Sequence, residues 1–167
     1  MGAEAVIALA AAVIALAALF VAIFEVRATR RHNRLSVRPV LQCRVTLREG
    51  EPSGLSITNA GLGPAVIVET RVWLDGVLMG PWNRECTIEV IKRLKKQPTT
   101  STLVEGSTLS PGTQKLLLGL SSYMPSENPD FKTLLETRLD LEVRYESLYG
   151  GENLMVTTRS PGWRSQP

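Results

Sequence analysis

The stretch from Ala5 to Phe24, AVIALAAAVIALAALFVAIF, constrains this chain more than any other feature because it holds twenty residues without a single charge. At about 1.5 Å per residue, a helix of this length reaches roughly 30 Å, which is the thickness of the hydrocarbon core of a bilayer. A helix on the surface of a soluble domain would have a polar face, and this stretch has none. The sequence therefore predicts a transmembrane anchor over residues 1–26.

A cluster of basic residues follows the apolar stretch and accounts for the formal net charge of +3. From Pro39 onward, fourteen basic residues balance fourteen acidic ones, so the charge of the remaining chain gives no indication of nucleic-acid binding. We assign residues 27–38 to a juxtamembrane segment whose arginines reach the phosphates of anionic lipid headgroups. The predicted membrane-surface residues are Arg27, Arg30, Arg31, Arg34 and Arg38.

The position of this basic cluster also predicts the orientation in the membrane. Arginines that flank a membrane helix stay on the cytoplasmic side. A secretory signal peptide is the competing interpretation, but such a peptide carries positive charge before its apolar run, where this chain has only Glu4. We expect a single-pass protein of the inner (cytoplasmic) membrane, with its N-terminus outside and its C-terminal domain in the cytoplasm.

Alanines spaced four residues apart share faces of the predicted membrane helix. Small residues at this spacing let two helices approach closely, which is a main source of attraction between helices in lipid. Alanine is also simply common in bacterial membrane helices, and both explanations stay open. The predicted partners are other membrane subunits or a second copy of the helix, through Ala8 and Ala12, Ala11 and Ala15, and Ala18 and Ala22.

Beyond Pro39 the apolar residues recur with a period of two, which is typical of β-strands. In the clearest case, the apolar side chains of residues 139–146 alternate with charged ones, as in an antiparallel sheet with one wet face. Asp75-Gly76 predicts a tight hairpin turn. The pattern predicts seven or eight strands, which are Val40–Leu47, Leu55–Thr58, Ala65–Leu74, Val77–Met79, Thr102–Val104, Lys115–Leu120, Leu139–Glu146 and Asn153–Thr158.

We therefore predict a mainly β fold in which the N-terminal transmembrane helix precedes an immunoglobulin-like antiparallel β-sandwich over residues 39–159. A C-terminal tail follows over residues 160–167. One amphipathic helix is inserted over Trp82–Lys96, with Asn83 as its N-cap. A further helical turn is expected over Phe131–Glu136, capped by Asp130.

The last turn of the inserted helix carries a basic cluster, where cations suit the helix dipole. The cluster is either a solvated helix end or a docking patch for lipid or for an acidic partner. Its members are Lys92, Arg93, Lys95 and Lys96.

The residue types that carry most enzyme chemistry are scarce in this sequence. The single histidine, His32, lies in the juxtamembrane segment, so the domain has no histidine for a catalytic triad or a histidine-rich metal site. Cys43 and Cys86 lie too far apart for a CxxC pair, and Gly61-Leu62-Gly63 is too short for a dinucleotide-binding loop. We expect no catalytic residue, no cofactor site and no metal site, and predict that the protein is not an enzyme.

Two loops have unusual compositions. Residues 59–65, NAGLGPA, concentrate residues that permit or fix unusual backbone angles, and residues 145–151 place two tyrosines around a hairpin. The structural explanation is that the first loop redirects the chain between strands and the second closes a hairpin. The functional explanation is that they form a surface that recognises a partner, because binding residues are concentrated on loops.

The order of the features resembles a known group of proteins. These features are a single membrane helix, a basic segment leading into SVRP, a strand ending in ITNAGLGPA, a DG turn, an SPG turn and a late VRYESLYGGE hairpin. The group consists of uncharacterised bacterial single-pass membrane proteins. The resemblance implies a cytoplasmic immunoglobulin-like β-sandwich and a membrane location, and it transfers no site residues.

Two functions fit these observations. In the first, the chain is a non-catalytic, membrane-anchored binding module that acts as an accessory or scaffold subunit of a membrane protein assembly. In the second, it is a membrane-tethered sensing or signalling module that responds to a small anionic ligand. The cations that would contact that ligand or a partner are Arg71, Arg84, Lys92, Arg93, Lys95 and Lys96.

Overall fold

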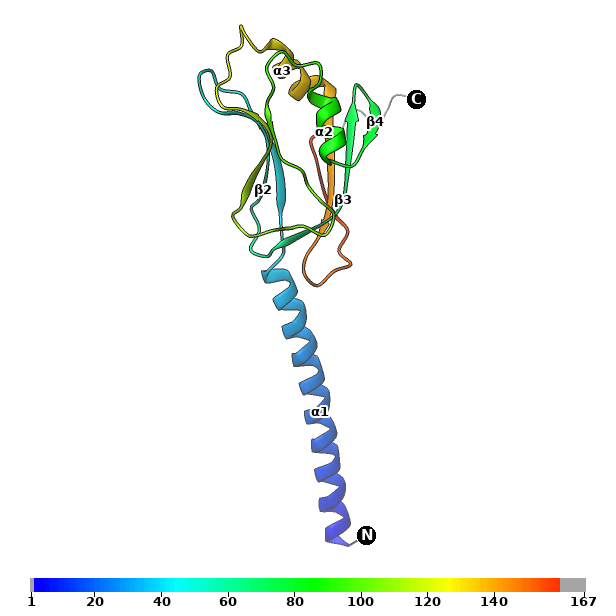
Figure 1. The fold of residues 1–167 in the computed structure, drawn as a ribbon. Helices are drawn as coiled ribbons and strands as arrows, with labels where there is room; N and C mark the ends of the chain where they lie inside the picture. Colours follow the sequence, from blue (N-terminus) through cyan, green and yellow to red (C-terminus); the bar gives the residue numbers. More distant parts are fainter. Residues whose placement is uncertain (1, 160–167) are drawn as a thin grey trace. The chain divides into compact units, whose positions relative to one another are not determined.

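The computed structural model describes residues 2–159, except for the side chains of residues 5 and 30–35. The predicted tail over residues 160–167 therefore lies outside the described residues, as do the side chains of Arg30, Arg31 and Arg34. The chain divides into two compact units, one ending at Ser36 and the other beginning at Val37. We describe each unit by itself (Figure 1).

The first unit is one continuous helix, α1 (Ala3–Ser36). Within it, Val6–Thr29 is long and apolar enough to cross a membrane, judged by length and composition. A signal sequence has the same length and composition, so the helix qualifies as either an anchor or a signal sequence. The prediction of one N-terminal apolar helix is confirmed.

The second unit contains two antiparallel sheets (Figure 1). The first sheet has the strand order β1-β2-β7-β5, and the second has the order β4-β3-β8-β9, with β6 also paired to β3. The strands of the first sheet are β1 (Leu41–Thr46), β2 (Ser53–Asn59), β7 (Gln114–Leu120) and β5 (Thr99–Thr100). Those of the second are β4 (Val77–Gly80), β3 (Ala65–Leu74), β8 (Leu139–Glu146), β9 (Leu154–Thr157) and β6 (Thr108–Leu109).

Local sequence signals explain several of these elements. The side chains of β8 alternate between buried and partly exposed along the whole strand, as its sequence predicts. Asp75 and Gly76 join β3 to β4 with φ angles of 53° and 80°, which are the positive values that a tight two-residue hairpin turn requires. Buried side chains of both sheets form one hydrophobic cluster, which includes Ile57 of β2, Leu117 of β7, Val72 of β3 and Leu141 of β8.

The inserted helix is shorter than predicted. α2 (Arg84–Ile91) begins where expected, because the Asn83 side-chain oxygen accepts a hydrogen bond from the Cys86 N–H at 2.9 Å. The prediction that it continues to Lys96 is wrong. The chain turns after Ile91 so that Leu94 is buried, and the Lys95 N–H donates to the Asp130 carboxylate at 2.9 Å. Lys92 caps the helix, and Arg93, Lys95 and Lys96 follow its end rather than forming its last turn.

Two further predictions need correction. Asp130 does not cap the second short helix. α3 (Pro129–Thr133) follows Asn128 and has a proline at its start, and the π-helical turn η1 (Leu134–Arg138) leads on to β8. The predicted strand Thr102–Val104 is wrong because the Leu103 N–H donates to the Trp82 carbonyl at 3.1 Å instead of to a neighbouring strand.

Candidate functional site

The outer edge of β3 is interrupted in its middle. Along one edge β3 pairs with β8 from Val66 to Leu74. Along the other edge it pairs with β6 at Ala65 and Val66 and with β4 from Val72 to Leu74. Ile67 exchanges hydrogen bonds of 2.8 and 2.9 Å with the loop at residues 106–107. Residues 68–71 therefore have no strand partner on this edge among the residues that the structure describes.

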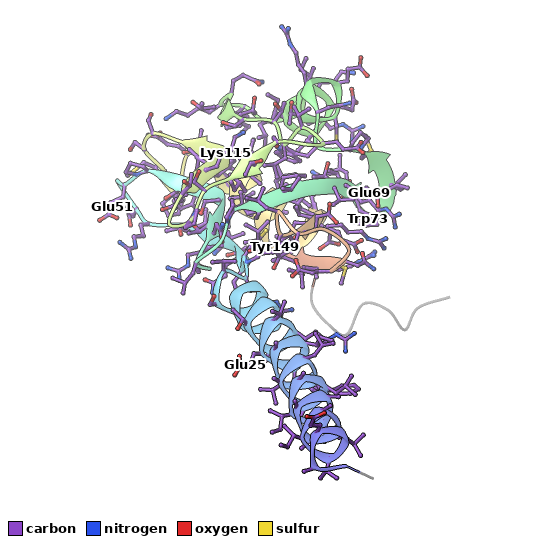
Figure 2. The ribbon with its side chains drawn as sticks, turned by 90° about the horizontal axis from the view of Figure 1, so that it is seen from below. Glu25, Glu51, Glu69, Trp73, Lys115 and Tyr149 are labelled. Atoms are coloured by element: carbon purple, nitrogen blue, oxygen red, sulfur yellow. The ribbon has the colours of Figure 1, made fainter. Side chains whose placement is uncertain are left out.

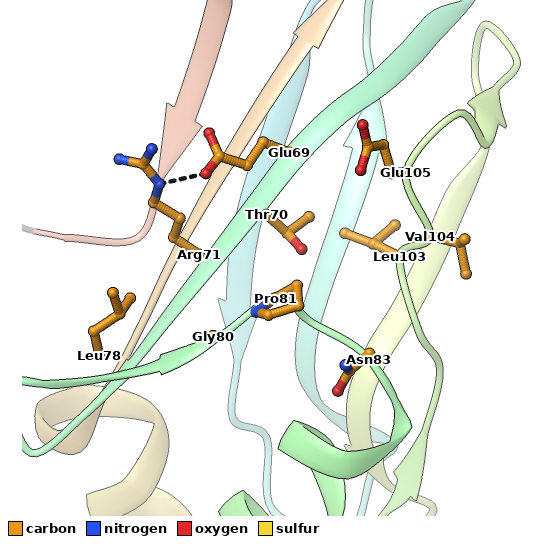
Figure 3. Close-up of a pocket in the computed structure, with 10 residues that line it drawn as sticks. All are labelled: Glu69, Thr70, Arg71, Leu78, Gly80, Pro81, Asn83, Leu103, Val104 and Glu105. Atoms are coloured by element: carbon orange, nitrogen blue, oxygen red, sulfur yellow. Dashed lines mark hydrogen bonds and ion pairs between the residues drawn. The ribbon is translucent and has the colours of Figure 1, made fainter.

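A cavity of about 450 Å³ opens beside this interrupted edge, and we call it the β3 recess (Figure 3). Apolar side chains supply much of its wall, and Leu78 and Val104 are themselves exposed. It is lined by Glu69, Thr70 and Arg71 of β3, by Leu78, Gly80, Pro81 and Asn83 around the end of β4, and by Leu103, Val104 and Glu105 of the following loop.

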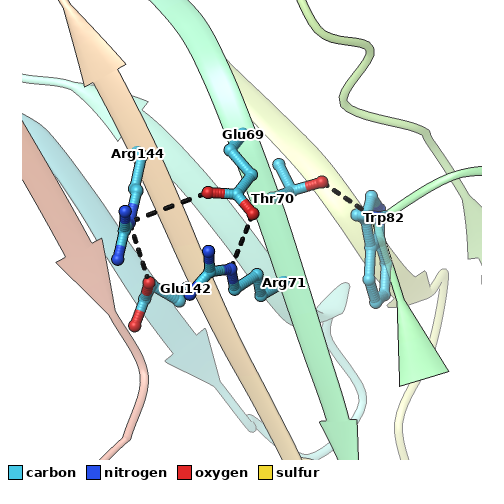
Figure 4. Close-up of polar contacts among 6 residues, drawn as sticks. All are labelled: Glu69, Thr70, Arg71, Trp82, Glu142 and Arg144. Carbon is cyan, nitrogen blue, oxygen red and sulfur yellow. Dashed lines mark hydrogen bonds and ion pairs between the residues drawn. The ribbon is translucent and has the colours of Figure 1, made fainter. Parts of the chain in front are cut away.

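Hydrogen bonds from Trp82 hold the wall of the β3 recess in place. The Trp82 side chain is fully buried, and its backbone N–H donates to the Thr70 hydroxyl at 2.8 Å (Figure 4). Its indole N–H donates to the Ser101 carbonyl at 2.6 Å. Because these bonds join β3, the end of β4 and the loop before residue 103, the three walls form one connected structure.

Two charged groups of the recess, Glu69 and Arg71, belong to a ladder of ion pairs on the second sheet (Figure 4). The Arg71 Nε donates to the Glu69 carboxylate at 2.6 Å. The other Glu69 oxygen lies 3.8 Å from the Nε of Arg144, which in turn lies 3.2 Å from Glu142. The hydrogen bond to Glu69 raises the pKa of Arg71, so this guanidinium stays charged and is already paired.

The six predicted anion-contacting cations do not converge on the recess, because only Arg71 is among its lining residues. Lys92 pairs with Glu89 at 3.2 Å, and the Lys96 ammonium lies 3.4 Å from the Ser122 carbonyl. Arg84, Arg93 and Lys95 have exposed side chains on or after α2. The other charged residues of the recess, Glu69 and Glu105, are acidic.

The predicted membrane contacts lie in or directly after α1. Arg27 and Arg38 are exposed, and so are the alanines proposed for helix packing, which are Ala8, Ala11, Ala12, Ala15, Ala18 and Ala22. Their contacts with lipid or with a second helix stay predictions.

The two cysteines are free thiols in the domain. Burial raises the pKa of the Cys43 thiol to about 12 and also raises the pKa of Cys86. Because the thiolate is the nucleophilic form, neither residue is activated for covalent chemistry.

Asn59, at the end of β2, is buried, and the sequence marked it as part of an unusual loop without assigning a role to its side chain. Its side-chain oxygen accepts hydrogen bonds from the N–H groups of Val40 at 3.2 Å and Gly61 at 3.0 Å. Its amide nitrogen donates to the carbonyls of Gly63 at 2.8 Å and Leu109 at 3.0 Å. Together the four hydrogen bonds link Val40, the loop after β2 and the end of β6. We call this end of the domain the proximal end.

The glycines of the NAGLGPA loop permit the close packing around Asn59. A Cβ atom at Gly61 would overlap the backbone at Arg38 and Val40, and one at Gly63 would overlap the Val37 carbonyl. We call residues 37–40 the proximal segment. The composition of the loop therefore has a structural explanation, and the sequence Asn-Ala-Gly-Leu-Gly at the end of a strand was the signal for it.

Comparisons with known proteins give one match. A family model described as a domain of unknown function, DUF8453, matches residues 5–159. No curated protein and no solved structure gives a significant match to the chain.

Proposed function

We propose, from the premise that this chain belongs to the DUF8453 family of domains of unknown function, that it is a non-catalytic, membrane-anchored binding module. Its role is that of an accessory or scaffold subunit that contacts another protein of a membrane assembly. The β3 recess is the observation that carries this proposal, because it combines an apolar cavity with an interrupted sheet edge.

In this proposal α1 is retained as a single-pass anchor. The five arginines after the apolar run support an N-terminus outside and a domain in the cytoplasm. The alanine faces of α1 supply a second contact, with other membrane subunits or with another copy of the helix. The alanine contact lies within the inner membrane, and the arginines that follow the apolar run contact anionic headgroups at its surface.

We further propose that the two sheets form an immunoglobulin-like sandwich. The strand order supports this proposal, since β1-β2-β7-β5 corresponds to the A-B-E-D sheet of that fold. The order β4-β3-β8-β9 corresponds to its second sheet, with β4 as an added strand. On this correspondence, the β3 recess lies at the edge of the second sheet.

An extended segment of a partner protein suits the recess better than a small anion does. A sheet edge without a strand partner offers backbone groups to an extended peptide, while apolar pockets beside it select side chains. In the sensing alternative, Arg71 is the one predicted cation that lines the recess and could bind the anion. Its guanidinium already donates a hydrogen bond to the Glu69 carboxylate. The chemistry of the lining therefore favours the accessory-subunit function.

Site-specific photocrosslinking in native membranes tests the proposal. The full chain carries a photoreactive amino acid at Val104, which is 62% exposed at the recess, or at Ile88, which is 53% exposed on α2 and outside the recess. We expect a discrete crosslinked membrane protein from position 104 and none from position 88. The substitution Leu78→Glu abolishes this product. Equal products from both positions, or no product from position 104, would overturn the proposed use of the recess.

A further inference from the structure

Three loops lie together at the proximal end of the second unit, which we call the β-domain. They are residues 60–64 between β2 and β3, residues 110–113 between β6 and β7, and residues 147–153 between β8 and β9. The strand register places them together, because Leu41 pairs with Asn59, Ala65 pairs with Leu109, and Val66 pairs with Glu146. We call them the proximal loops, and Figure 2 labels Tyr149 in the third of them.

The proximal loops are almost without charge but expose large apolar side chains. Glu152 is the one charged residue within these ranges, and its carboxylate accepts a hydrogen bond from the Ser147 N–H at 2.8 Å. The carboxylate of Glu146, the last residue of β8, accepts a hydrogen bond from the Gly151 N–H at 2.8 Å. Leu62 is 77% exposed, Leu148 is 68% exposed and Tyr149 is 51% exposed. Exposed apolar side chains that gather at one end of a domain mark a site of contact with a protein or a membrane.

Leu62 is held beside the chain that leaves the membrane helix. Its neighbours Gly61 and Gly63 lie against the backbone of the proximal segment so closely that neither position has room for a Cβ atom. The Asn59 side chain bonds Gly61, Gly63 and Val40. The loop backbone is therefore fixed to the proximal segment, while the Leu62 side chain points away from the core into solvent.

The length of the tether limits how far this end of the domain lies from the bilayer. Seven residues, 30–36, separate the apolar span Val6–Thr29 from Val37. They measure about 10 Å as a helix and about 25 Å when fully extended. The interfacial zone of each leaflet is roughly 5–8 Å thick. At its helical length the tether therefore brings the proximal segment to within a few ångströms of this zone, so the loop bonded to that segment can reach it.

We propose that the proximal loops form a membrane-contacting surface, in which Leu62, Leu148 and Tyr149 insert into the interfacial region of the bilayer. Tyrosine suits this region because its ring is apolar and its hydroxyl stays hydrated. Two or three apolar side chains at the interface hold a tethered domain in one orientation. This inference rests on the proposed function, because it requires α1 to be a membrane anchor.

Fluorescence quenching in vesicles tests this contact. The full chain is reconstituted, at about one chain per vesicle, in phosphatidylethanolamine and phosphatidylglycerol that include a lipid with a quencher high on its acyl chain. A fluorophore is attached at Leu62→Cys, at Tyr149→Cys or, as a matched exposed control, at Ile88→Cys. A fourth label at Leu16→Cys reports on the insertion of α1, and the unsubstituted chain measures labelling of Cys43 and Cys86.

We expect the labels at positions 62 and 149 to be quenched about threefold more than the label at position 88. Leu148→Asp lowers the quenching at position 149, and Ile88→Asp does not. Equal quenching at positions 62, 149 and 88, together with strong quenching at position 16, overturns the loop contact and leaves the anchor intact. Absence of quenching at position 16 overturns the anchor itself, and the loop contact with it. With one chain per vesicle, neither a second copy nor another protein produces the signal.

Discussion

The two ends of the β-domain are held together by different chemistry. At the proximal end, a buried asparagine and two closely packed glycines fix the loops, and Glu152 is the single charged residue of those loops. The opposite, distal end comprises residues 47–52, 75–76, 92–98 and 121–138. Its charged residues are Arg48, Glu49, Glu51, Asp75, Lys92, Arg93, Lys95, Lys96, Glu127, Asp130, Lys132, Glu136 and Arg138.

The distal end also carries exposed ion pairs. Arg48 pairs with Glu51 at 3.3 Å, and Arg138 makes two hydrogen bonds of 2.6 Å to Asp75. Exposed pairs contribute roughly 0–1 kcal/mol each because water competes for both partners. Buried amide hydrogen bonds have no such competitor, and an orphaned partner costs about 1–3 kcal/mol. We therefore expect the loss of an Asn59 contact at the proximal end to cost more than the loss of an exposed ion pair at the distal end.

The largest expected difference between the ends comes from two glycine substitutions. In Gly63→Ala the new methyl group overlaps the Val37 carbonyl, so the proximal segment must move and the free energy of unfolding falls by about 3–4 kcal/mol. In Gly50→Ala at the distal end the methyl group has open space, and only the positive φ of 75° costs about 1–2 kcal/mol. Urea denaturation of the detergent-solubilised chain, followed by tryptophan fluorescence, measures both.

Equal losses from these two glycine variants would contradict the close contact between residue 63 and the proximal segment. If Gly63→Ala both lowers the free energy of unfolding and makes residues 37–40 susceptible to protease cleavage, the proximal segment is the part that the substitution displaces.

Two buried asparagines give the next largest difference. Asn59→Ala leaves two N–H groups and two carbonyls without their side-chain partner, so we expect a loss of about 2–4 kcal/mol in the free energy of unfolding. Asn128→Ala at the distal end removes one hydrogen bond, to the Met124 N–H at 3.2 Å, and costs about 1 kcal/mol. The same denaturation experiment compares them. A distal loss as large as the proximal one would remove the distinction between the ends.

Elements with local signals could be predicted from the sequence. Strand β8 follows from its strict alternation, the hairpin turn from Asp75-Gly76, and the start of α2 from Asn83. In each case the residues that determine the structure are neighbours in the chain. The apolar run of α1 is the same kind of signal, because its composition marks the span Val6–Thr29 within the longer helix.

Features set by distant residues could not be predicted. The end of α2 depends on Asp130, which accepts a hydrogen bond from Lys95 across 35 positions of sequence. The β3 recess depends on β4 and β6 pairing with different stretches of one edge, and β6 has only two residues. The unusual composition of the NAGLGPA loop is visible in the sequence, but its contact with residues 37–40 is a property of the fold.

A smaller effect is expected from acid at the distal end. The hydrogen bond from Arg138 lowers the pKa of Asp75, so the pair stabilises the fold above the ordinary carboxyl pKa of about 4 and is lost as the pH falls through the lower folded value. Asp75→Asn keeps a residue that tolerates the positive φ of 53°. The variant therefore melts below the unsubstituted protein at neutral pH, and the gap in melting temperature closes in acid. A gap that persists at low pH would assign the effect to the turn instead of the ion pair.

The smallest expected change in the free energy of unfolding comes from two serine substitutions. They test whether Leu62 acts in folding or in membrane contact. Leu62→Ser and Ile88→Ser both replace exposed side chains, so each changes the free energy of unfolding by less than about 0.5 kcal/mol in detergent. Only Leu62→Ser lowers lipid quenching of a fluorophore at Tyr149→Cys, because only Leu62 lies among the proximal loops. If Leu62→Ser instead destabilised the fold as much as Asn59→Ala, Leu62 would belong to the packing of this end. Since its two glycine neighbours and Asn59 already complete that packing, we expect the leucine to be available for lipid.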